Sequence, residues 1–280
     1  MEGDISSSFA FLRYRDALDH SGQDLDISVT RNTFWSYCGP LLRDEEDLPA
    51  NLHEWASATL SKSLLPILLP FLSYANGFIT RSGLDHYWLT IRATKATSEY
   101  DRPRWHTDDM FFASSGGLGS GAQITDNRRS GGMCERLPAL ETDWKMCGTL
   151  LGPPTMFIPD EHQATARDIQ RSTKQALATD HSCTSIRCVG CATTADAVRE
   201  KLGNEFSRLG TAQAAPGECS FFRIGHDKGA VHSEPSMRAG DRIFINIVPG
   251  KKAELGALMS KWGMDFPWAW WIAPNVSRQL

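Results

Sequence analysis

The stretch RWHTDDMFF, residues 104–112, places an imidazole and a carboxylate two residues apart, at His106 and Asp108. On a β-strand alternate side chains point to the same face, so these two groups would project together while Thr107 points away. Such a pair is either a histidine oriented by its neighbour or two arms of a metal site. His-x-Asp alone is weak evidence, because a chain with eight histidines produces it readily by chance.

A second feature of the sequence favours the metal site. In VHSEPSMRAGDRIFINIV, His232 lies at the end of one expected strand, and Arg242 begins the next strand after a Gly-Asp turn. We expect these two strands to be adjacent and antiparallel, which would direct the imidazole and the guanidinium into one cavity.

A His-x-Asp pair, a distant histidine and an arginine ten residues beyond it resemble the iron(II)- and 2-oxoglutarate-dependent oxygenase superfamily. The resemblance implies a double-stranded β-helix, that is, a jelly-roll of the cupin type. It implies that His106, Asp108 and His232 hold Fe(II) as a facial triad. It also implies that Arg242 binds the far carboxylate of 2-oxoglutarate through its planar fork. The long interval between His106 and His232 departs from the compact members of the superfamily.

The implied activity uses Fe(II), 2-oxoglutarate and O2. Decarboxylation of 2-oxoglutarate to succinate would be coupled to hydroxylation of a small organic substrate, or to its desaturation or cyclisation. The main contribution of the protein would then be to position the reactants, with little acid–base work of its own.

The segment HYWLTIRATK, residues 86–95, alternates apolar and polar residues and is expected to be a strand. In the superfamily, the strand before the His-x-Asp motif commonly lines the same pocket. The resemblance therefore makes Arg92 and Thr90 candidates to contact 2-oxoglutarate or an acidic substrate. An Arg92 that points outward into solvent is the alternative.

Two other functions are considered. A cupin-like protein that binds a metal or ligand without turnover would keep the same barrel. A redox or zinc protein could be organised around Cys183, Cys188 and Cys191, whose C-x4-C-x2-C spacing is that of plant-type ferredoxin clusters. Nothing else in the chain resembles a ferredoxin domain.

These residues must be positioned by a mainly β fold with flanking helices. Helical spacing and strand alternation along the chain predict one domain over residues 1–280. The Gly- and Ser-rich segment at 113–132 is expected to be an exposed loop and is a candidate lid. The expected parts of the domain are a helical N-terminal support (1–80), a jelly-roll core (81–250) with a helical insert at about 160–212, and an aromatic C-terminal tail (251–280).

Composition limits the partners. A net charge of −4 and a pI near 6.1 provide no basic field for nucleic acid. We expect no membrane partner, because the most apolar window is short and contains Pro66 and Pro70. A reducing cytoplasmic compartment fits the odd number of cysteines, which is seven. The Trp-rich tail would pack on the core or form a homodimer.

Overall fold

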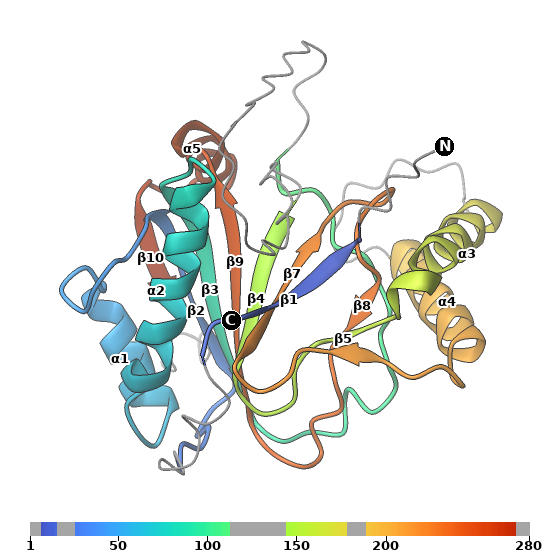
Figure 1. The fold of residues 1–280 in the computed structure, drawn as a ribbon, viewed down its shortest axis with the longest axis horizontal. Helices are drawn as coiled ribbons and strands as arrows, with labels where there is room; N and C mark the ends of the chain where they lie inside the picture. Colours follow the sequence, from blue (N-terminus) through green and yellow to red (C-terminus); the bar gives the residue numbers. More distant parts are fainter. Residues whose placement is uncertain (1–6, 16–25, 113–143, 178–188, 273–280) are drawn as a thin grey trace, which may run out of the picture.

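The computed structural model describes residues 7–15, 26–112, 144–177 and 189–272 (Figure 1). The lid candidate at 113–132 lies outside these residues. The strands are β1 (Phe9–Arg13), β2 (Thr33–Pro40), β3 (His86–Thr94), β4 (Trp144–Leu151), β5 (Met156–Phe157), β6 (Ala212–Gln213), β7 (Glu218–Arg223), β8 (His232–Ser233), β9 (Arg242–Gly250) and β10 (Trp268–Trp271). The helices are α1 (Ala50–Thr59), α2 (Leu65–Arg81), the short 3-10 turn η2 (Asp160–His162), α3 (Gln163–Ala176), α4 (Val189–Glu205) and α5 (Lys252–Lys261).

Most of the strands form one antiparallel seven-stranded sheet in the order β1-β7-β4-β9-β3-β2-β10. A mainly β fold with flanking helices is therefore confirmed. The expectation of a helical support over residues 1–80 is wrong for its first half, because β1 and β2 belong to this sheet. Only α1 and α2 follow the expectation. The short β1 segment, FAFLR, is stabilised by pairing with β7, more than 200 residues away, which local periodicity does not reveal.

The two faces of the large sheet have different neighbours. On β3, Leu89 and Ile91 are fully buried in the main core, together with Leu68 and Phe71 of α2. At Gly148 of β4 an added Cβ would lie 2.5 Å from the Phe71 ring, so the helix approaches the sheet closely there. Figure 1 shows α1 and α2 lying on this side of the sheet. The opposite face is free to line a site.

A second, three-stranded sheet in the order β6-β5-β8 carries the rest of the strands. Helices α3 and α4 lie beside it, and they confirm the helical insert expected at about 160–212 (Figure 1). A small apolar cluster joins them to the segment before His232, through Trp105, Val231 and Leu202 among others. The sequence expectation that the His232 strand pairs with the Arg242 strand is wrong, because β8 pairs with β5 and β9 lies between β4 and β3.

The C-terminal tail packs on the core. Helix α5 follows β9, and β10 pairs with β2 at the edge of the large sheet, with Trp271 opposite Trp35. A homodimer through this segment stays a prediction. None of the helices in the described residues has the length and apolar character needed to cross a membrane.

Candidate metal centre

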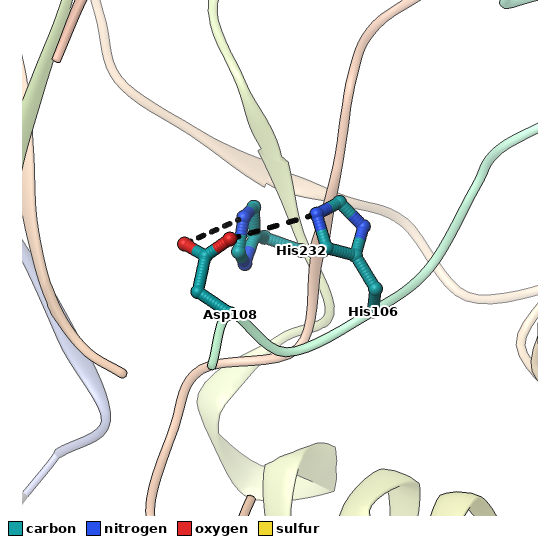
Figure 2. Close-up of side chains that lie close together, drawn as sticks. All are labelled: His106, Asp108 and His232. Atoms are coloured by element: carbon teal, nitrogen blue, oxygen red, sulfur yellow. Dashed lines mark ion pairs between the residues drawn. The ribbon is translucent and has the colours of Figure 1, made fainter. Parts of the chain in front are cut away.

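His106, Asp108 and His232 lie together, as the sequence predicted, and they are the group in the described residues able to hold a metal ion. Their ligand atoms all lie within 4.8 Å of one another. Asp108 Oδ1 is 3.8 Å from His106 Nε2, and Asp108 Oδ2 is 3.5 Å from His232 Nε2. Figure 2 shows the carboxylate facing both imidazoles. Two neighbouring ligands of an octahedral ion with bonds of about 2.1 Å are about 3 Å apart, so a metal would need only a small contraction.

The backbone brings the two histidines together in a way that the sequence did not predict. His106 and His232 form a single antiparallel bridge, with both N–H···O distances at 2.9 Å. Asp108 lies outside any strand, and its carbonyl accepts a 2.7 Å hydrogen bond from the Gly225 N–H. The expected strand carrying both His106 and Asp108 is therefore wrong, although the two side chains still meet.

Both imidazoles present Nε2 to the centre of the group. His106 Nδ1 lies 2.6 Å from the Arg104 carbonyl, and His232 Nδ1 lies 2.9 Å from the Ala230 carbonyl. A carbonyl can only accept, so each Nδ1 carries a proton, and in the neutral form of either ring Nε2 keeps its lone pair. This is the tautomer that a metal ligand needs, fixed by contacts of the kind found around metal-bound histidines.

The charge states of the group also suit a cation. Burial lowers the pKa of His232 to about 4, against the attraction of Asp108, so this imidazole is neutral at pH 7. Burial alone would raise the pKa of Asp108, but the nearby positive charge, above all the Lys145 ammonium, outweighs it and holds that pKa well below its usual range. Asp108 is therefore an anion beside the neutral His232 imidazole.

Lys145 of β4 is a member of the site that sequence reasoning missed. Its ammonium forms an ion pair with Asp108 Oδ2 and lies 4.9 Å from the centre of the Phe222 ring. Burial would lower the pKa of Lys145, yet Asp108 more than offsets this and the pKa is raised. The signal was present in WKMCGTLL, because a lysine inside a short apolar strand is seldom buried without a partner.

Helix α3 supports both parts of the triad through two buried glutamines. Gln163 Nε2 donates to the Ile158 and Val231 carbonyls at 2.7 and 3.1 Å, and its Oε1 accepts from the Val231 N–H at 2.7 Å. Gln170 Nε2 donates to Thr107 Oγ1 at 2.9 Å. Val231 precedes His232, and Thr107 lies between His106 and Asp108. Helix α3 therefore holds a chain neighbour of each of the three candidate ligands.

The triad opens into a pocket of about 470 Å³ between the large sheet and the small one. Arg242, at the start of β9, lines this pocket and is only 5% exposed. Its guanidinium donates to the Pro153 carbonyl at 3.0 Å and to Thr155 Oγ1 at 3.1 Å, and lies over the Phe244 ring at 4.4 Å. Burial lowers the pKa of Arg242 to about 10, which leaves it positively charged at neutral pH.

The weaker candidates Arg92 and Thr90 line the same pocket. Arg92 is exposed, whereas Thr90 Oγ1 is 2.7 Å from Ser36 Oγ on the neighbouring strand. Glu234, which sequence reasoning missed as a pocket residue, lies on the wall opposite the large sheet. Burial would raise the pKa of Glu234, but the nearby His106 and a backbone N–H lower it, so it is ionised.

The cysteine cluster is mostly beyond what the structure describes. Cys183 and Cys188 lie outside the described residues, and Cys191 is exposed on α4. The further cysteine downstream, Cys219, is buried in β7, where its thiol donates to the Leu12 carbonyl at 3.4 Å. A zinc or redox role for this group stays a prediction.

Searches with models of protein families, among curated proteins and among solved structures each found no match. The chemistry of this pocket is therefore the guide to what the protein does.

Proposed function

We propose that the protein is an iron(II)- and 2-oxoglutarate-dependent oxygenase that acts on a small organic molecule. The observation that supports this best is the shared pocket. It combines a two-histidine, one-carboxylate group with a buried arginine, and both faces of the pocket come from β-sheets as in a double-stranded β-helix. This ligand set is associated with non-haem Fe(II) oxygenases.

His106, Asp108 and His232 would hold Fe(II), and Arg242 would bind the far carboxylate of 2-oxoglutarate. When bound, Fe(II) supplies the reactivity toward O2 that couples decarboxylation of 2-oxoglutarate to oxidation of the substrate. Arg242 is held by a carbonyl and a hydroxyl, so its fork is oriented before the ligand arrives. Thr90 and Arg92 would contact 2-oxoglutarate or the substrate from β3.

The test is an anaerobic titration with Fe(II) and 2-oxoglutarate. We expect visible absorption that requires both components and that is lost in His106→Ala. Arg242→Gln should weaken 2-oxoglutarate binding by about 10–100-fold, the value of a charge-assisted hydrogen bond, while Co(II) still binds. The exposed Arg31→Gln is the matched control. A His106→Ala protein that keeps the absorption would contradict the ligand assignment.

One observation favours the non-catalytic alternative, a cupin-like binding protein. The Lys145 ammonium already neutralises Asp108, so an anionic ligand could bind beside Arg242 without any metal. In that case 2-oxoglutarate would bind with equal affinity with and without Fe(II), and no succinate would form on exposure to air. Succinate release with oxygen consumption would exclude this alternative.

A further inference from the structure

The floor of the pocket is formed by cross-strand neighbours on the face of the large sheet that points away from α2. On β3, Thr90 lies opposite Ser36 of β2 and Asn246 of β9. Arg92 lies opposite the two phenylalanines of the next row, Phe34 on β2 and Phe244 on β9. Because alternate residues share a face, all of them point into the pocket, which agrees with its lining.

The strands beneath the pocket define two halves. The half over β4 and β9 contains the triad, Lys145 and Arg242, and the proposed function assigns it to the metal and 2-oxoglutarate. The other half lies over β3, β2 and β10 and is rich in aromatic rings. Those rings are Phe34, Trp88, Trp262 and Trp270.

Trp88 is held rigidly in the aromatic half. Its indole N–H donates to Ser36 Oγ at 2.9 Å, and Ser36 Oγ lies 2.7 Å from Thr90 Oγ1. The Trp262 ring meets Trp88 edge-on, with centroids 5.0 Å apart and an interplanar angle of 66°. A wall that is already ordered loses little entropy when a flat apolar ligand packs on it.

Arg92 brings a charge to this half. Among the described residues no hydrogen bond or ion pair involves the Arg92 guanidinium, and the diagonal neighbour of Arg92 on β9 is Arg242, another cation. The two anions of the pocket lie on the triad side: Asp108 is paired with Lys145, and Glu234 faces His106. An exposed, unpaired guanidinium beside a second one attracts an anion and repels a cation.

We propose that the aromatic half binds the substrate, and that the substrate is a small organic acid with a flat apolar body. Its anionic group pairs with Arg92, and its body packs on Trp88 and Trp262. A cationic substrate held by the same rings is disfavoured, because the lining carries three cations, Arg92, Lys145 and Arg242, against two carboxylates. The inference rests on the proposed function only in naming this ligand as the substrate.

Calorimetry with a matched pair of probes tests the inference without iron or 2-oxoglutarate. The metal-free protein is titrated with 3-phenylpropanoate and with its uncharged analogue 3-phenylpropanamide, at low salt. We expect the acid to bind at least about tenfold more tightly, as an arginine–carboxylate pair implies. Arg92→Gln should abolish this preference, and Arg31→Gln should keep it. Added salt should reduce it, since Arg92 is exposed.

A second variant separates the apolar contact from the charge. Trp262→Ala should weaken both probes by a similar factor and leave their ratio unchanged, because the ring contacts the shared body of the two ligands. Equal binding of acid and amide to the wild type overturns the inference. So does a preference that survives Arg92→Gln and disappears in Arg242→Gln. Failure of the iron-dependent absorption is a separate result, since these titrations contain no metal.

Discussion

Replacement of Lys145 by methionine tests whether its ammonium takes the place of a metal ion next to Asp108. Methionine is similar in length and carries no charge, so Lys145→Met leaves the carboxylate without its counter-ion. The Lys145 and Asp108 side chains are only 9% and 20% exposed. Loss of one partner of a buried ion pair costs about 3–5 kcal/mol. At roughly 2 °C per kcal/mol for a large domain, the metal-free variant should unfold at least about 6 °C below the wild type.

Metal binding should reverse much of this loss. A divalent cation bound by Asp108 restores the missing positive charge, and in the variant it no longer meets a neighbouring ammonium. Return of about 3 kcal/mol on binding corresponds to roughly hundredfold tighter binding, since each 1.4 kcal/mol is about tenfold in Kd. The assay is a Co(II) competition titration with thermal unfolding in parallel.

Two controls make the result specific. Lys201→Met removes an exposed lysine on α4 and should change neither stability nor Co(II) affinity. In the double variant Asp108→Asn, Lys145→Met, neither charge is left unpaired, so metal-free stability should recover while Co(II) binding is lost. A Lys145→Met protein as stable as the wild type, or one that binds Co(II) more weakly, would refute the reasoning.

The remaining predictions concern α3, packing and pH. Gln163→Ala leaves buried backbone groups without a hydrogen-bond partner, so it should lower the free energy of unfolding in urea by about 1–3 kcal/mol. It should also lower the Co(II) affinity about 10–100-fold. Replacement of the exposed Gln175 by alanine should change neither quantity. Gly148→Ala should lower the free energy of unfolding by about 1–3 kcal/mol, because the added methyl group would overlap the Phe71 ring. Gly203→Ala in α4 meets open space and should raise it by about 0.5–1 kcal/mol. Equal effects of the two substitutions would contradict the packing described. Burial raises the pKa of Cys219 from 9.0 to about 12, so the folded state keeps a proton that the unfolded chain releases. Stability should therefore fall between pH 9 and pH 12, by about 1.4 kcal/mol per pH unit from this thiol, and Cys219→Ala should flatten the urea midpoint against pH.

The candidate ligands and the buried arginine of the pocket could be predicted from the sequence. His106, Asp108, His232 and Arg242 are of types whose combination is specific, and the structure places all four on one pocket. The resemblance also made Thr90 and Arg92 of β3 candidates for the pocket, and both line it. These predictions needed no knowledge of long-range pairing.

The residues missed are those whose role depends on partners far along the chain. Lys145 is meaningful only beside Asp108, and Gln163 only beside Val231, more than sixty residues away. The same reason explains the wrong pairing of β8. It has two residues, too few for a periodic signal, so its partner is decided by tertiary contacts.

The large sheet and the triad are stabilised by different parts of the molecule, and this separates the two halves of the pocket energetically. On β3 every second residue is buried against α2 and the residues between them line the pocket, so a slip of one residue would exchange core and site. The β3 part of the aromatic half is therefore tied to the main core. The triad is tied to the large sheet through the Lys145–Asp108 ion pair, but its two histidines depend on a two-residue strand, one bridge and the glutamines of α3, where local opening should cost less free energy. Changes in α3 should thus impair metal binding before they affect the aromatic half.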